Sequence, residues 1–233
     1  MNILLTGASR GIGAATLKLL QDGRHEVAGH STRGGEGLLG ADLARPGAAT
    51  DLWDSALNAL GGRIDVLVNN AGIYEAAPIG LSDADWIAQW QRTLQVNLIA
   101  AGELCRKAVE HFEAQGGGRI INVASRAAFR GDSADHWHYA ASKAGMVGMT
   151  KSIARAYAAK GILAFAVAPG FTVSEMTEEY LAGRGGAAIV ADIPLGRVTS
   201  TDEVAEAIRW LAIDAPAAST GSIIDLNGAS YVR

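Results

Sequence analysis

The stretch TGASRGIG, residues 6–13, joins the short apolar run NILL at residues 2–5 to the apolar-periodic segment GAATLKLLQ at residues 13–21. Glycines in such a junction let the backbone turn sharply and approach a pyrophosphate, whose charge is stabilised by free amides at the helix N-terminus. A glycine-rich loop also makes plain strand-to-helix turns, but its place at the first such junction favours a dinucleotide site. The candidate cofactor-binding residues of this loop are Gly7, Ser9, Arg10, Gly11, Ile12 and Gly13.

Short apolar runs alternate with helical patterns along the rest of the chain. The runs are VAGHS (27–31), IDVLV (64–68), GRIINVAS (118–125) and ILAFAVAPG (162–170), and the long helical patterns span about 82–115, 139–160 and 200–212. Continuously apolar strands spaced by helices predict a parallel sheet covered on both faces. We therefore predict an α/β fold with a doubly wound parallel sheet, and 233 residues fit one domain.

One predicted connection is too short for this pattern. Only TRGGEG, residues 32–37, separates VAGHS from the next candidate strand in LLGADL, residues 38–43. A crossover helix between parallel strands needs more residues than that. Either the helix is missing or the second segment is not a strand.

Composition limits the classes of partner. Apolar residues make up 49% and charged residues 19%, as in ordinary globular proteins. A net charge of -4 gives no reason to expect nucleic acid or an anionic membrane, so a small soluble partner is favoured. The single cysteine, Cys105, excludes a disulfide framework and a thiolate zinc cluster, and it indicates a reducing compartment, by default the cytoplasm. We expect no metal site, no targeting segment and no membrane span.

Further motifs follow in a characteristic order: NNAG at 69–72, Asn97 in LQVNLIAAG, Ser125 at the end of INVAS, Tyr139 and Lys143 in YAASK, and PG at 169–170. From Asn2 to about Gly228 the chain resembles the short-chain dehydrogenase/reductase family in its classical branch, including 3-oxoacyl-acyl-carrier-protein reductases. The resemblance implies one Rossmann-type domain over residues 1–233. It also implies hydride transfer between a nicotinamide cofactor and a carbonyl or alcohol.

The spacing of Tyr139 and Lys143 has its own chemical logic. A tyrosine supplies a proton at neutral pH only if its pKa of about 10 falls by roughly 3 pH units, which requires about 4 kcal/mol of preferential phenolate stabilisation. Residues i and i+4 share a helix face, so we expect the Lys143 ammonium to lower the pKa of Tyr139. Ser125, at the carboxyl end of its strand, is expected to hold the substrate oxygen.

By the resemblance, the side chain of Asn97 holds a water that links Lys143 to solvent. The plainer alternatives are a solvent-facing tyrosine–lysine pair, a serine that only ends a strand, and an asparagine that only bends a helix. The predicted catalytic residues are Asn97, Ser125, Tyr139 and Lys143.

The residues after the second strand favour NADP(H) over NAD(H). NAD specificity usually rests on an acid after the second strand that binds the ribose 2′-hydroxyl, but here the first acid after VAGHS is Glu36. Arginine suits a 2′-phosphate, which could be surrounded by Arg10, Ser31, Thr32 and Arg33. Alternatively, Arg33 is a solvated charge of the loop with no role in binding.

The resemblance assigns further cofactor contacts. It implies that Asp42 and Leu43 lie beside the adenine, that Asn70, Ala71 and Gly72 pass along the adenosine ribose, and that Tyr139 and Lys143 also contact the cofactor, with Lys143 anchoring its ribose. It further implies that the nicotinamide carboxamide is held by Pro169, Gly170, Thr172 and Ser174, although threonine is usual at the last position.

The resemblance also implies that residues 171–196 cover the substrate, with apolar contacts from Met176, Tyr180, Leu181 and Ile189. Trp137 is expected beside the site. Arg126 and Arg130 either meet a phosphate or carboxylate or are solvated. His136 and His138 are predicted to be polar loop residues ahead of the helix, because no third ligand of metal-binding spacing is near.

A 3-oxoacyl thioester, a small aldehyde, a sugar or a cyclic ketone fits equally well as substrate. The family commonly forms tetramers through its two long central helices, so a homo-oligomer is expected. Two other functions stay open: an NAD-dependent alcohol dehydrogenase of the same family, and a protein that senses NADP without turnover.

Overall fold

The computed structural model describes residues 1–172 and 186–233, which form a seven-stranded parallel sheet in the order β3-β2-β1-β4-β5-β6-β7. This confirms the predicted doubly wound α/β class. The strands are β1 (Asn2–Leu5), β2 (Glu26–Ser31), β3 (Leu39–Gly40), β4 (Val66–Asn69), β5 (Gly118–Val123), β6 (Ile162–Pro169) and β7 (Ile223–Leu226).

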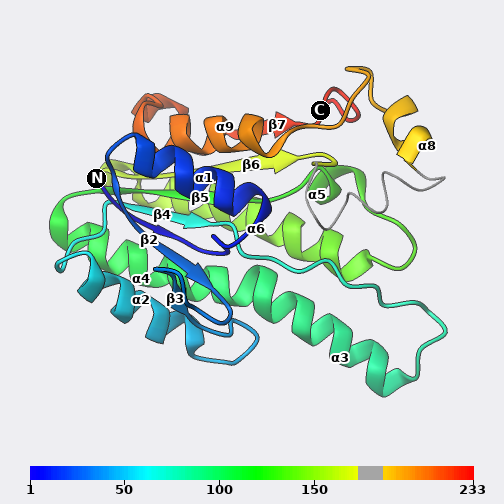
Figure 1. Ribbon diagram of the computed structural model, residues 1–233, viewed down its shortest axis with the longest axis horizontal. Coiled ribbons are helices and arrows are strands. Elements are labelled where there is room, and N and C mark those ends of the chain that lie inside the picture. Colours follow the sequence, from blue (N-terminus) through cyan, green and yellow to red (C-terminus); the bar gives the residue numbers. More distant parts are fainter. Residues whose placement is uncertain (173–185) are drawn as a thin grey trace.

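Helices cover both faces of the sheet (Figure 1). Helices α1 and α9 pack together on one face, while α2, α4 and α6 lie on the other. The α-helices are α1 (Gly11–Asp22), α2 (Ala48–Ala59), α3 (Asp83–Leu94), α4 (Ala100–Gln115), α5 (Ala127–Arg130), α6 (Trp137–Tyr157), α8 (Gly186–Ala191) and α9 (Thr201–Ile213). Short 3-10 turns span Ala158–Lys160 and Ala217–Ser219. No helix in these described ranges is long and apolar enough to cross a membrane.

The core consists of two apolar layers, one on each face of the sheet. Alternate side chains of a strand point to opposite faces. Leu4 and Leu67 therefore pack with α2 and α4, whereas Ile3 and Val66 pack with α1 and α9. All four are fully buried. Burial on both faces explains why the strands read as continuous apolar runs.

The short connection between β2 and β3 contains no helix. β3 has two residues and pairs only with the last two residues of β2. The loop therefore has to bring the chain back along β2 by only that short length. Gly34, Gly35, Glu36 and Gly37 all have positive φ. The Leu38 N–H donates to the Gly35 carbonyl at 2.9 Å, so Glu36 and Gly37 form the centre of a tight reversal of type I′ character. The strand prediction was right, and the crossover helix is missing.

Both long helices form near their predicted positions, with two differences. The first is α3 followed without a break by a π-helical turn, Gln95–Ile99, and by α4. The second, α6, begins at Trp137, so the prediction that His138 lies in a loop ahead of the helix is wrong. His138 is fully buried, with its ring 5.7 Å from that of Trp90 on α3. This contact between helices is not visible in local sequence.

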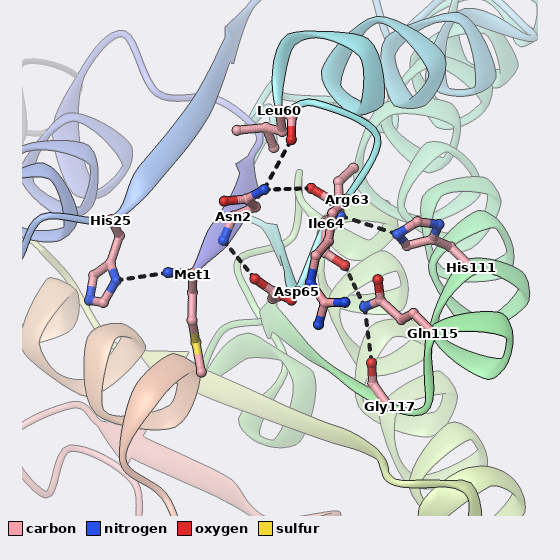
Figure 2. A network of polar contacts seen from close by, with 10 residues as sticks. All are labelled: Met1, Asn2, His25, Leu60, Arg63, Ile64, Asp65, His111, Gln115 and Gly117. Atoms are coloured by element: carbon pink, nitrogen blue, oxygen red, sulfur yellow. Dashed lines mark hydrogen bonds and ion pairs between the residues drawn. The ribbon is translucent and has the colours of Figure 1, made fainter.

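A polar network closes the amino-terminal edge of the sheet (Figure 2). The Asn2 side chain donates to the carbonyls of Leu60 and Arg63, both at 3.0 Å, and the Ile64 N–H donates to His111 Nε2 at 3.1 Å. Gln115, at the end of α4, donates to the Ile64 carbonyl at 2.7 Å. These bonds tie β1 and the approach to β4 to α4 at the edge opposite the glycine-rich loop.

Candidate active site

The glycine-rich loop has the close packing that its glycines predict. Gly7 and Gly11 have φ of +68° and +54°, conformations that favour glycine. A Cβ at Gly13 would lie 1.9 Å from the Gly7 carbonyl oxygen, and one at Gly7 would lie 2.8 Å from Ala71 Cα. Arg10 is the N-cap of α1, and no side-chain hydrogen bond caps that helix end. The start of α1 therefore has no side-chain cap, and the backbone beside it carries no side chains at the glycines. This arrangement fits a pyrophosphate.

Thr6 and Asn70 lock this loop to the end of β4. Asn70 Nδ2 donates to the carbonyls of Thr6 and Gly7, both at 2.9 Å. Thr6 Oγ1 accepts from the N–H groups of Asn70 and Ala71, both at 3.0 Å. Sequence reasoning missed Thr6, although a hydroxyl residue directly before the first glycine was the available signal. Ser9 is exposed, and Ile12 packs on the core beneath.

Among the predicted 2′-phosphate residues, Ser31, Thr32 and Arg33 lie at the end of β2 and the start of the β2–β3 loop, and Arg10 lies at the start of α1. Ser31 is buried, and its Oγ already accepts from the Gly34 N–H at 3.0 Å. Thr32, Arg33 and Arg10 are exposed, and neither arginine forms an ion pair within the described ranges.

Two neighbouring residues of the loop after β3 differ in burial. Asp42 is exposed, and its Oδ1 accepts from the Ala44 N–H at 3.0 Å. Leu43 is buried and belongs to the core cluster of α2 and α4.

Ser125, Tyr139 and Lys143 meet at the carboxyl edge of the sheet. The Ser125 hydroxyl accepts from the Ala127 N–H at 3.1 Å, and it acts to lower the pKa of Tyr139. Lys143 is 4% exposed, donates to the Val123 carbonyl at 2.8 Å, and lies 5.7 Å from the centroid of the Tyr139 ring. Lys143 is buried and Tyr139 is half-buried, so they are not the solvent-facing tyrosine–lysine pair of the plainer alternative.

Asn97 lies in the π-helical turn and is fully buried. Its Oδ1 accepts from the Ile73 N–H at 2.8 Å, and its Nδ2 donates to the Ile73 carbonyl at 3.0 Å and to Ser142 Oγ at 3.3 Å. Both donors of the amide are thus engaged by the protein. The side chain holds the Ile73 main chain, and its predicted role in holding a water stays a prediction.

The side chains of Asn97 and Lys143 both lie beside Gly72. A Cβ at Gly72 would lie 3.4 Å from Asn97 Oδ1 and 3.5 Å from Lys143 Nζ. Gly72 itself is exposed. The clamp by Asn97 on Ile73 therefore also fixes the backbone that faces the lysine.

Burial gives the tyrosine and the lysine opposite changes in pKa. Burial raises the pKa of Tyr139 to about 12, although the hydrogen bond with Ser125 acts to lower it and Asp132 raises it further. Burial lowers the pKa of Lys143 to about 8. The expected lowering of the Tyr139 pKa by Lys143 is therefore wrong for the chain alone, because desolvation outweighs the favourable groups.

An aromatic residue that sequence reasoning missed stands beside Tyr139. The Tyr74 ring meets the Tyr139 ring edge to face at 4.8 Å between centroids and stacks on His136 at 3.9 Å. Its hydroxyl donates to Asp132 Oδ1 at 3.0 Å. Tyr74 follows NNAG by two residues, and that position next to a motif was the available signal. Trp137 is 51% exposed at the first position of α6.

Arg126 and Arg130 have different partners. Arg130 forms a 2.8 Å ion pair with Asp192. Arg126 donates to Ser230 Oγ, and its guanidinium lies 4.8 Å from the centroid of the Phe171 ring. Within the described parts of the chain, Arg126 has no carboxylate partner. Neither side chain is simply solvated.

The end of β6 is held from two sides. The Pro169 carbonyl accepts from the Arg126 N–H at 2.9 Å, and the Gly170 N–H donates to the Leu226 carbonyl at 2.9 Å. Thr172 is buried, and its hydroxyl donates to the Gly170 carbonyl at 3.3 Å. Ser174, Met176, Tyr180 and Leu181 lie outside the described residues, as does the side chain of Ile189.

Cys105 is buried in hydrogen-bond contact with Asn69 and Asn122, and burial raises its pKa to about 12. No group of three potential metal ligands occurs among the described residues.

Comparisons with known proteins agree with this geometry. A family model described as "Enoyl-(Acyl carrier protein) reductase" matches residues 7–228. The 3-oxoacyl-[acyl-carrier-protein] reductase FabG of Escherichia coli (strain K12) is 32% identical, over 98% of this chain and 96% of that protein. The cis-4-hydroxycyclohexanecarboxylate dehydrogenase of Sinomonas cyclohexanicum is 35% identical, over 97% and 94% of the two chains.

Solved structures are similar over almost the whole length. The TT0495 protein of Thermus thermophilus superposes with a TM-score of 0.90 at 29% identity, covering 98% of each chain. A candidate NAD(P)-dependent gluconate 5-dehydrogenase of Beutenbergia cavernae, with NADP bound at low occupancy, superposes with a TM-score of 0.87 at 32% identity. The match covers 98% of this chain and 95% of that one.

Proposed function

Since the chain belongs to the short-chain dehydrogenase/reductase family and is an NAD(P)-dependent oxidoreductase with a Rossmann-type fold, we propose that it transfers a hydride between NADP(H) and a carbonyl or secondary alcohol. The observation that carries the proposal is the meeting of Ser125, Tyr139 and Lys143 beside Gly72. We further propose that residues 1–233 act as one domain and that residues 171–196 cover the substrate.

The proposed cofactor site fits a dinucleotide. Its pyrophosphate part is the backbone of residues 7–13, where side chains at Gly7 or Gly13 would collide with neighbouring main chain. The 2′-phosphate is assigned to Arg10 and Arg33, whose exposed guanidiniums have no carboxylate partner in the described ranges. A bound nicotinamide supplies or accepts the hydride.

Tyr139 is the proposed proton donor in carbonyl reduction. Its pKa of about 12 means that it holds its proton at neutral pH. When the substrate carbon receives the hydride, the phenol gives this proton to the substrate oxygen, and the Ser125 hydroxyl hydrogen-bonds the same oxygen as its charge develops. The Lys143 ammonium, 5.7 Å from the ring centroid, stabilises the phenolate that remains. Asn97 is a positioning residue that holds Ile73 and hence Gly72.

Two observations favour different substrate classes. The relatives named as 3-oxoacyl-[acyl-carrier-protein] reductases support a 3-oxoacyl thioester. The half-buried guanidinium of Arg126, one residue after Ser125, supports a substrate that carries a carboxylate, and the relative from Sinomonas cyclohexanicum is named for a hydroxycarboxylate. A screen of both classes with both cofactors distinguishes them. We also propose a homo-oligomer, which light scattering on the purified protein tests.

Replacing Tyr139 with phenylalanine tests the reaction directly. The variant loses the transferable proton but keeps the ring, so we expect carbonyl reduction to fall by about two to four orders of magnitude while cofactor affinity stays within a few-fold. Stopped-flow oxidation of NADPH and calorimetric titration measure the two properties. Tyr157→Phe, on the same helix, is the matched control and should keep wild-type rates. Undiminished turnover by Tyr139→Phe would refute the assignment.

A further inference from the structure

His30, in β2, has a buried imidazole whose two ring nitrogens both meet main-chain groups. The residue is 2% exposed. Its Nδ1 accepts a hydrogen bond from the Gly7 N–H at 3.2 Å, and its Nε2 lies 2.8 Å from the Ala41 carbonyl oxygen. An amide N–H only donates and a carbonyl only accepts, so these partners select a neutral imidazole with its proton on Nε2.

The two partners lie on the two loops proposed to hold the adenosine diphosphate half of the cofactor. Gly7 is the first glycine of the loop at residues 6–13, and Ala41 directly precedes Asp42. Main-chain bonds support the same link, because the Ala8 N–H donates to the His30 carbonyl at 2.7 Å and the Ala41 N–H donates to the Ser31 carbonyl at 3.1 Å. The imidazole is therefore a side-chain bridge between two main-chain segments.

We propose that His30 is a positioning residue for dinucleotide binding, whose neutral imidazole holds Gly7 at a fixed distance from the loop at residues 41–43. The inference rests on the dinucleotide site proposed above. It adds a residue that acts through Gly7 and Ala41, since the buried ring is enclosed by the protein. With Ala71 packed against its other side, Gly7 is fixed between two neighbours.

A pH dependence follows from the tautomer. Protonation places an N–H on Nδ1, which then faces the N–H of Gly7, and two donors cannot pair. The neighbouring strands β1 and β3 carry no titratable side chain. Burial lowers the pKa of His30 and the bond to Ala41 raises it. The charged residues of the glycine-rich loop, of α1 and of the loops on either side of β3 are not among the causes of the shift; they are Arg10, Lys18, Asp22, Arg33, Glu36, Asp42 and Arg45.

Binding of NADP⁺, measured by calorimetry between pH 8 and pH 5.5, tests the bridge with two variants. His30→Leu removes both hydrogen bonds, so its dissociation constant at pH 8 should rise about three- to tenfold. His30→Asn keeps an acceptor near the Nδ1 position but does not titrate, so it should bind more tightly than His30→Leu. The affinity of the wild-type protein should fall more steeply with acid than that of His30→Asn. Titration of the cofactor phosphate is common to all three proteins and cancels in this comparison.

The tautomer gives a readout that does not depend on the cofactor. Long-range ¹H–¹⁵N NMR spectra at pH 8 should show His30 protonated on Nε2 alone, and protonation on Nδ1 would overturn the proposal. Wild-type affinity in His30→Leu would overturn it too. If His30→Leu does not fold, equal pH dependence of the wild-type protein and His30→Asn overturns it. A wild-type protein that binds neither NADP⁺ nor NAD⁺ at pH 8 refutes the dinucleotide site itself, which distinguishes the two failures.

Discussion

Lys143 is buried and Tyr139 is half-buried, and desolvation disfavours the charged form of each. At neutral pH the tyrosine keeps its proton and the lysine, with a pKa of about 8, is mostly charged. The protein thus rests in the protonation state that carbonyl reduction requires. Alcohol oxidation requires the opposite state of Tyr139, because the phenolate must accept the proton of the alcohol.

The two directions should therefore respond differently to pH. Alcohol oxidation should become faster as the pH rises from 7 to 9, because the phenolate fraction grows with pH below the Tyr139 pKa of about 12. Carbonyl reduction should gain nothing over this range and should decline above pH 8 as Lys143 loses its charge. Initial rates in both directions at saturating cofactor measure the profiles. An oxidation rate that does not rise with pH would contradict the assigned base.

Arg33 is the residue on which the proposed cofactor preference depends most. Arg33→Ala should weaken NADPH binding by about tenfold or more and change NADH binding by less than about twofold, because only NADPH carries the 2′-phosphate. Fluorescence titration with each cofactor measures both constants. Arg106→Ala, on the exposed surface of α4, is the control and should change neither. Equal weakening of both cofactors would show that Arg33 does not read the 2′-phosphate.

Among the elements, the β2–β3 loop and the π-helical turn were the least predictable. The length of TRGGEG indicated that a helix was missing, but the tight reversal at residues 35–38 depends on φ values that the sequence does not state. The π-helical turn at Asn97 reads as ordinary amphipathic helix. The π-helical turn is explained by a tertiary contact, since it brings the Asn97 amide to Ile73.

Glu36 provides a direct test of the reversal. It has φ of +54° and is exposed, so a side chain there costs conformational energy without a compensating burial. Glu36→Gly should raise the free energy of unfolding above that of Glu36→Ala by about 1 kcal/mol, because both variants remove the charge but only glycine tolerates this φ freely. Urea unfolding of the two variants measures the difference. If the alanine variant is as stable as the glycine variant, the turn has another conformation.

Over the whole molecule, sequence reasoning succeeded where the signal is local and periodic. The strands, the glycine-rich loop and the Tyr139–Lys143 spacing follow from runs, turns and helix geometry. The reasoning failed where contacts between distant segments decide, as for the buried His138 and the pKa of Tyr139. Thr6 and Tyr74 each lie beside a motif, but their partners are close only in the folded chain, and both residues were missed.

The histidines should make the stability of the whole molecule sensitive to mild acid. All five histidines, His25, His30, His111, His136 and His138, have pKa values lowered by burial. Their contribution is complete above about pH 6.5, the unfolded pKa, and is lost as the pH falls toward the folded values. The free energy of unfolding, measured with urea, should therefore decrease from pH 7 to pH 5.5.

His111→Gln isolates one of these contributions. A glutamine oxygen can accept the Ile64 N–H that His111 Nε2 accepts, but it does not titrate. The variant should therefore lose less stability between pH 7 and pH 5.5 than the wild-type protein. A loss as large as that of the wild-type protein would exclude His111 from the acid response.

The two-residue length of β3 also determines how the sheet ends. A long, flat edge strand presents a row of unpaired N–H and C=O groups to which another chain can add, and many proteins block such edges with charges or bulges. Here the chain leaves the sheet at Gly40 after pairing only His30 and Ser31. The loop that replaces a crossover helix thus ends the sheet on an edge strand of two residues, and very short edge strands are one of the ways in which proteins limit intermolecular strand pairing.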